Sequence, residues 1–216
     1  MRIKSLEFEP ALFKPASFPC NERVVLVCGQ NADELLDLIR ITVGDVRGRN
    51  ITDSGCTVYS EVEFSDKSYD VCCMLNADGL GQHRIGVGFE PGSSSVAAAS
   101  NEEYVSRISD QNTNGDNAFY AYRCNYDPSG LLSESGRALA ELDRFIDCAR
   151  LAAEVGDERP LFVYGVFERI DKSASRLNVV RTIASAGRQA FVSVSSPDEA
   201  NALLNNTPND CFAISI

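Results

Sequence analysis

The sequence predicts an α/β fold in which a layered, mostly parallel sheet is combined with an antiparallel β-meander subdomain. Strand-like and helix-like segments alternate over the carboxyl-terminal half, as they do in parallel sheets whose strands are joined by helices. Residues 57–89 contain three segments of alternating apolar and polar residues separated by turn residues, which favours a meander. The chain has no heptad stretch, so we expect no coiled coil.

The amino-terminal half begins with an alternating segment at residues 2–9. It continues with an apolar run at residues 23–28, which is typical of a strand buried on both faces. Gly29 follows this run, and a helix is expected over residues 33–42. The meander strands are expected at residues 57–64, 69–75 and 84–89. Polar connectors are expected at residues 91–100 and 110–117.

The carboxyl-terminal half begins with a long helix expected over residues 133–155, where apolar residues recur on one face. The remaining strands are expected at residues 161–166, 190–194 and 211–216, and the remaining helices at residues 173–186 and 197–204. A chain of 216 residues can bury a good core as one unit. We therefore expect a single domain over residues 1–216, with two lobes of approximately residues 1–100 and 101–216.

The composition restricts the class of protein. With 44% hydrophobic and 24% charged residues, it is ordinary for a globular protein. There is no run of eighteen apolar residues and no secretory signal, so we expect a cytoplasmic location. The eight cysteines show no C-x-x-C spacing. We therefore expect reduced, buried thiols and no metal site.

The formal net charge of −11 argues against a broad nucleic-acid interface, because phosphate binding depends on Lys and Arg. The arginines of the carboxyl-terminal third are interleaved with acids, and we expect them on solvated helical faces. They are Arg144, Arg150, Arg159, Arg169, Arg176, Arg181 and Arg188. Four aromatic residues near the middle of the chain are expected in the core rather than on a stacking surface. They are Tyr104, Phe119, Tyr120 and Tyr122.

Residues 160–171, PLFVYGVFERID, contain the most informative motif. An apolar strand here ends in Tyr164 and Gly165, and Phe167 and Asp171 follow. In P-loop nucleotide hydrolases, a strand of this kind ends in an Asp that holds magnesium and an acidic neighbour that handles the attacking water. Neither acid is present at the end of this strand.

The turn after the strand at residues 23–28 departs from a P-loop in a similar way. A working P-loop reads G-x-x-x-x-G-K-[ST]. Counted from Gly29, Glu34 takes the place of the second glycine, Leu35 that of the lysine and Leu36 that of the hydroxyl residue. A deletion of three residues before Leu35 supplies no lysine either. Asn31 and Glu34 instead fit a helix capping box, with Asp33 adding a carboxylate to the positive helix end.

Two further segments add to the strand end at residues 160–171 and the turn after Gly29. Leu132-Ser-Glu-Ser-Gly136 precedes the long helix, and Ser195 follows the strand at residues 190–194. In this order, the segments resemble the SMC/RecF-type branch of the ABC ATPases, in a compact form. The resemblance implies a P-loop NTPase (ABC ATPase-like) fold with Gly29 and Asn31 in the loop. It places Ser133 and Gly136 in the signature, Asp171 in the D-loop and Ser195 where the switch histidine is expected.

The same resemblance implies a function without catalysis. The expected protein is a pseudo-ATPase that acts as a protein-interaction or regulatory module, with no catalytic residue, metal or cofactor. Its expected partners are proteins, either a second copy of the chain or an intact ATPase. One alternative is a divergent ATP-binding protein that acts through Ser133, Glu168 and Asp171. Another is an accessory subunit of an intact ABC-type ATPase.

Overall fold

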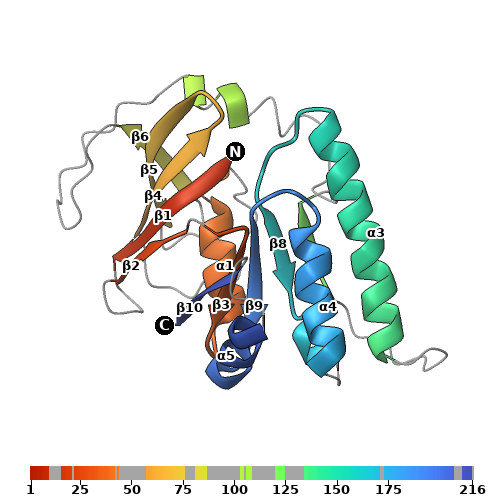
Figure 1. Cartoon of the computed structure of the whole chain (residues 1–216). Helices are drawn as coiled ribbons and strands as arrows, with labels where there is room; N and C mark the ends of the chain where they lie inside the picture. The colour runs from red at the N-terminus through yellow and green to blue at the C-terminus, as the bar shows by residue number, and fades with distance from the viewer. Residues whose placement is uncertain are drawn as a thin grey trace. The chain divides into compact units, whose positions relative to one another are not determined.

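The structure is a computed structural model that describes residues 1–9, 16–20, 22–41, 43, 57–75, 81–86, 103–104, 106–108, 120–124, 134–170, 173–206 and 211–215 (Figure 1). It divides into two compact units. The first contains residues 1–21, 37–115 and 216, and the second contains residues 22–36 and 116–215. This division differs from lobes of 1–100 and 101–216, because the strand within residues 22–36 pairs with strands of the carboxyl-terminal part.

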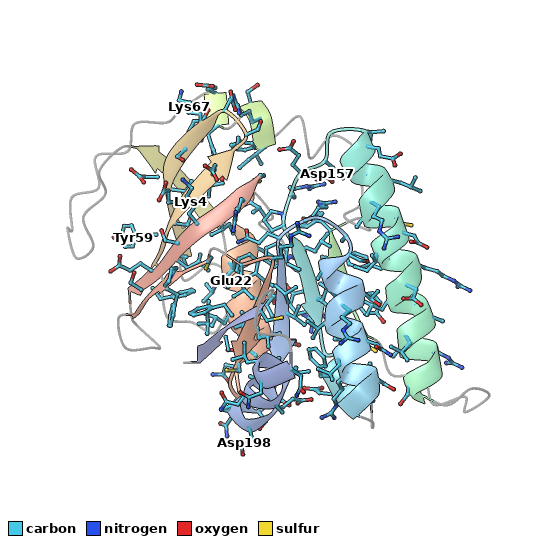
Figure 2. The ribbon with its side chains drawn as sticks, in the orientation of Figure 1. Lys4, Glu22, Tyr59, Lys67, Asp157 and Asp198 are labelled. Carbon is cyan, nitrogen blue, oxygen red and sulfur yellow. The ribbon has the colours of Figure 1, made fainter. Side chains whose placement is uncertain are left out.

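The first unit contains an antiparallel sheet with the strand order β2-β1-β4-β5-β6. Its strands are β1 (Arg2–Glu9), β2 (Ala16–Pro19), β4 (Thr57–Phe64), β5 (Lys67–Leu75) and β6 (Gly81–Gly86). Alternation places Val58, Val62 and Phe64 in the core, while Glu61 and Glu63 are only partly buried. Lys4, labelled in Figure 2, forms ion pairs with these two acids at 3.4 and 3.1 Å.

The meander prediction is confirmed, with three differences, the first being that β5 begins at Lys67, two residues earlier than predicted. β4 has the predicted bounds, whereas β6 begins three residues earlier than predicted, because Gly81 pairs with Leu75 across the hairpin. β2 was not predicted, since four residues show too short an alternation, and it forms by pairing with β1. The predicted connectors at residues 91–100 and 110–117 lie outside the described residues.

The second unit contains a five-stranded sheet with the order β10-β3-β9-β8-β7, in which every neighbouring pair is parallel. Its strands are β3 (Val24–Cys28), β7 (Ala121–Arg123), β8 (Leu161–Tyr164), β9 (Ala190–Val194) and β10 (Cys211–Ser215). Every residue of β3, β8 and β9 is buried. Their apolar runs therefore reflect burial on both faces of the sheet, as predicted.

The helices are α1 (Ala32–Ile41), α3 (Glu134–Glu154), α4 (Ser173–Ala184) and α5 (Pro197–Asn206), with a 3-10 turn η1 (Phe167–Arg169). In the second unit, α4 contacts β3, and α5 contacts β3, β9 and β10. α3 contacts α4 and η1 and lies alongside α4 (Figure 1). Within the described ranges, no helix combines the length and apolar character needed to cross a membrane.

The strand predicted over residues 161–166 is two residues too long. β8 ends at Tyr164 because Gly165 has a φ of +63°, in the left-handed region that favours glycine. Val166 is already helical, with φ −71° and ψ −37°, and η1 follows it. The chain therefore turns away from the sheet immediately after Tyr164.

The prediction that all carboxyl-terminal arginines lie on solvated helical faces is wrong for Arg159 and Arg188, which are both buried. Asp157, labelled in Figure 2, accepts a hydrogen bond from Arg159 Nη2 at 2.7 Å and one from Arg188 Nη2 at 3.3 Å. Arg188 Nη1 also donates to the Ala149 carbonyl of α3 at 3.1 Å. The Arg159 guanidinium carbon lies 4.0 Å from the centroid of the Tyr120 ring. These contacts join the end of α3 to the starts of β8 and β9.

The expected aromatic and cysteine cores are confirmed where the structure describes them. Tyr104 and Tyr120 are buried, Tyr122 is partly buried, and Phe119 lies outside the described residues. Three of the described free cysteines are buried and two are partly buried. The buried ones are Cys20, Cys28 and Cys211, and the partly buried ones are Cys124 and Cys148.

Candidate functional site

The carboxyl ends of the parallel strands form one edge of the second unit's sheet, where open α/β sheets bind their ligands. Backbone hydrogen bonds continue past the strand ends at this edge. Gly29 N donates to the Val194 carbonyl at 3.2 Å, and Cys124 N donates to the Tyr164 carbonyl at 3.1 Å. The residues that follow β3 and β7 are therefore bonded to the last residues of β9 and β8.

An ion pair between Arg123 and Asp33 crosses this edge. Arg123 ends β7, Asp33 lies in the first turn of α1, and their Nη1 and Oδ2 atoms are 2.8 Å apart. In the strand order, β9 and β8 lie between β7 and β3, the strand that leads into α1. The two side chains are 49% and 45% exposed, so the pair contributes little to stability, about 0–1 kcal/mol.

Tyr164 lies beneath the arginine of this ion pair. The Arg123 guanidinium carbon is 4.2 Å from the centroid of the Tyr164 ring, a distance at which a cation and an aromatic face attract each other. Tyr164 is 1% exposed, so the burial predicted for it is confirmed. The end of β8 therefore presents an aromatic ring to the edge, and the ring is covered by a cation from the neighbouring strand.

A hydrogen bond between Gly165 and Ser193 connects the turn after β8 to β9. Gly165 N donates to Ser193 Oγ at 3.0 Å, which ties the turn to the buried hydroxyl of β9. A Cβ at Gly165 would meet no atom nearer than 4.0 Å. The requirement for glycine therefore comes from the left-handed backbone rather than from space.

The predicted loop residues lie at the start of α1. Ala32 N donates to the Gly29 carbonyl at 3.3 Å, and Leu35 N donates to the Asn31 carbonyl at 3.0 Å. Asn31 is exposed and Glu34 is partly buried. The capping box formed by the side chains of Asn31 and Glu34 stays a prediction.

Leu35 and Leu36 belong to the buried face of α1. Leu35 is 2% exposed and Leu36 is fully buried. The positions that the sequence aligns with the P-loop lysine and hydroxyl residue are therefore occupied by core side chains. Their methyl groups pack in the interior and offer no hydrogen bond to an anion.

The remaining predicted site residues lie in separate parts of the chain. Gly136 is exposed in the first turn of α3, Ser195 is exposed after β9, and Ser133 and Asp171 lie outside the described residues. Ser135 Oγ donates to the Arg169 carbonyl at 3.0 Å, which links the start of α3 to η1. Glu168, in η1, is exposed. Among the residues that the structure places, no cluster of three or more His, Cys, Asp or Glu side chains is arranged to hold a metal ion.

The sequence did not indicate Arg123, which the structure places at the end of the outermost strand, over Tyr164 of the neighbouring strand. β7 has only three residues, so its alternation is too short to mark a strand. The available signal was an arginine directly after the aromatic and small residues of 119–122, at a possible strand end. That signal does not identify Asp33 as the partner, because the two residues are 90 positions apart.

Known proteins resemble this chain in structure but not in sequence. No protein-family model and no curated protein sequence matches the chain. An SMC head domain from Thermotoga maritima matches with a TM-score of 0.56 at 12% identity, over 95% of this chain and 92% of that one. An Smc head bound to the C-terminal winged-helix domain of ScpA matches with a TM-score of 0.65 at 10% identity, over 100% and 95% of the two chains.

The chain has the fold of an SMC head domain. A third solved structure agrees, an Smc head with an extended coiled coil bound to the C-terminal domain of ScpA derived from Pyrococcus furiosus. It has a TM-score of 0.55 at 10% identity over 99% of this chain and 93% of that one. The SMC-head fold combines the parallel and antiparallel sheets described above, and the described residues contain no coiled coil. The predicted ABC ATPase-like fold class is confirmed.

Proposed function

We propose that the protein is a catalytically inactive ABC/SMC/RecF-like pseudo-ATPase that acts as a protein-interaction or regulatory module. The observation that carries the proposal is the Arg123–Asp33 ion pair over the buried ring of Tyr164. These three side chains lie at the carboxyl edge of the sheet, the edge at which a nucleotide would be bound in an active relative.

The chemistry of phosphate binding supports this proposal. A nucleotide site of this class needs a lysine for the outer phosphates and a carboxylate for magnesium. The aligned lysine position is Leu35, which is buried, and the strand that should end in the magnesium ligand ends in Tyr164. The Asp33 carboxylate occupies the amino-terminal turn of α1, where its charge would repel a phosphate.

The charges at this edge are already paired. Arg123 could attract a phosphate, but its guanidinium is bonded to Asp33 and stacked on Tyr164. An anion would have to compete with the Asp33 carboxylate for this guanidinium. The edge thus resembles a site whose ligand has been replaced by side chains of the chain itself.

Protein partners are the second part of the proposal. Two of the similar solved structures are complexes of SMC heads with ScpA domains, so this fold presents surfaces that bind proteins. We propose that this chain likewise binds a protein, either a second copy of itself or an intact ATPase. We propose a cytoplasmic location for the protein.

Thermal unfolding with and without ATP and magnesium tests the proposal. A ligand at a hundredfold excess over its dissociation constant stabilises the folded state by about 2.7 kcal/mol, which is readily measured as a rise in melting temperature. We expect no rise for this protein and no phosphate release. An intact ABC-type ATPase head, measured in parallel, provides the positive control. A clear rise in melting temperature would favour the divergent ATP-binding alternative.

A further inference from the structure

The outer face of α3 differs from that of an ordinary solvated helix. Its inner face packs into the second unit through Leu142, Ile146 and Ala149. On the opposite face, Leu151 is 61% exposed and Val155, in the turn that follows the helix, is 75% exposed. They are the exposed large hydrophobic residues of the described chain, and they lie four positions apart, on one side of the helix. These two residues give the outer face an apolar end that a partner could cover.

The same outer face has small residues at the opposite end of the helix from these large ones. Gly136 and Ala140 are exposed near the start of α3 and, like Leu151 and Val155, are separated by four positions. Two small residues therefore lie at the amino-terminal end of α3, and two large ones lie at its carboxyl-terminal end and in the turn that follows it. Two antiparallel copies of such a helix place large residues opposite small ones at both ends, which permits close packing.

The charges on this face have the same symmetry. Arg144 and Asp147 are exposed near the middle of α3, with Arg137 towards its start and Glu154 at its end. A two-fold axis midway between residues 145 and 146 pairs Arg144 with Asp147 of the second copy and Arg137 with Glu154. Both pairs join opposite charges, and each occurs twice because the contact is symmetric.

We propose that α3 is a self-association surface that binds the α3 of a second copy of this chain in an antiparallel, two-fold symmetric pair. The same axis pairs Ala140 with Leu151 and Gly136 with Val155. The partner is a second copy because the face is complementary to itself in both size and charge. The proposal deepens the proposed function by naming a protein partner, and it does not require nucleotide.

The register of the pair follows from the same residues. A shift of one helical turn in one direction places Arg144 opposite Leu151 of the second copy, which loses its ion pair. A shift of one turn in the other direction places Arg137 opposite Arg150, and like charges then meet. Asp147 Oδ1 also lies 3.0 Å from Arg150 Nη1 of its own helix. Of these three registers, the stated one both pairs Arg144 with Asp147 and Arg137 with Glu154 and places Leu151 against Ala140.

Sedimentation velocity without nucleotide tests this pairing across a concentration series. A single helix pair buries an area at the lower end of stable interfaces, so we expect a dissociation constant on the order of 10–100 µM. Arg144→Glu and Asp147→Arg each place like charges across the axis, and we expect each to weaken association about tenfold or more. Leu151→Glu should abolish association, because it buries a carboxylate against Ala140.

A mixture of the two charge variants is the decisive sample. In a mixed pair, Glu at position 144 faces Arg at position 147, and the native Arg144 faces the native Asp147. We therefore expect the mixture to associate at least as strongly as the wild type, although neither variant does so alone. Arg181→Glu, on the exposed surface of α4, is the matched control and should leave association unchanged.

Three results would overturn the proposal. They are a wild-type protein that stays monomeric at about 300 µM, charge variants that associate as well as the wild type, or a mixture that does not recover. Circular dichroism of each variant establishes that it is folded. Because no nucleotide is present, a failure here is distinct from a failure of the pseudo-ATPase proposal, which ATP-dependent stabilisation tests.

Discussion

At the scale of single residues, Tyr164 decides what lies at the end of β8. Its ring is buried beneath Arg123, so truncation leaves a cavity that the rigid strand ends cannot close. We expect Tyr164→Ala to lower the free energy of unfolding by roughly 3 kcal/mol or more. Tyr164→Phe keeps the ring and should cost about 1 kcal/mol. Urea denaturation of both variants measures the difference, and equal costs for the two would argue against ring packing.

Asp157 makes the stability of the folded protein depend on pH. Burial alone would raise the pKa of its carboxyl, but the hydrogen bond from Arg159 and the charges of Arg159 and Arg188 outweigh burial and lower the pKa. Burial lowers the pKa of Arg188 to about 10, so it is still charged at neutral pH. A carboxyl whose pKa is lowered by folding stabilises the protein above its unfolded pKa, about 4, and this contribution disappears as the pH falls through the folded value.

We therefore expect the wild type to lose stability on acidification below about pH 4. Asp157→Asn removes the titrating group and leaves buried guanidinium groups without their counter-charge, so it should be less stable at neutral pH by about 3 kcal/mol or more. The gap between wild type and variant should narrow from about pH 4 downwards. Unfolding curves of both proteins at a series of pH values provide the measurement. A difference in unfolding free energy that does not change with pH would show that Asp157 is not the group responsible.

At the scale of elements, α1 shows why one substitution cannot restore a nucleotide site. Leu35 is on the buried face, so Leu35→Lys introduces an ammonium group into the core. We expect a loss of about 3 kcal/mol or more in unfolding free energy and no gain in ATP binding. Asp33→Asn is the companion variant, because it removes the repelling carboxylate at an exposed position. Calorimetric titration with ATP and magnesium should show no binding to either. Micromolar binding by Asp33→Asn would show that only this carboxylate closes the site.

At the scale of the whole molecule, the net charge of −11 opposes contact with nucleic acid. Two of the arginines that could contact phosphates are paired with acids. Arg123 is paired with Asp33 at 2.8 Å, and Arg107 is paired with Asp66 at 2.7 Å. We expect no binding of duplex DNA at about 50 mM salt, where electrostatic binding is strong. Fluorescence anisotropy of a labelled duplex measures this. Saturable binding that weakens with added salt would reveal a basic surface that net charge conceals.

Periodicity in the sequence predicted most of the local elements, although not the short strands β2 and β7. The apolar runs of β3, β8 and β9 indicated strands buried on both faces, and the alternation in β1 and β4 indicated a sheet with one buried face. Their order along the chain was enough to identify the fold, which the SMC-head structures confirm. The sequence also showed that the loop after Gly29 has no P-loop lysine or hydroxyl residue, because the identity of a side chain can be read without the structure.

Contacts between residues far apart in the chain could not be predicted without the packing of the elements. β7 is a strand because it pairs with β8, and Arg123 reaches Asp33 although 90 positions separate them. Asp157 and Arg188, 31 positions apart, form a buried ion pair that the interleaved charges of the sequence did not reveal. The physical reason is common to all three. Periodicity reports which face of an element is buried, whereas strand order and the packing of elements decide which side chains are brought together across that burial.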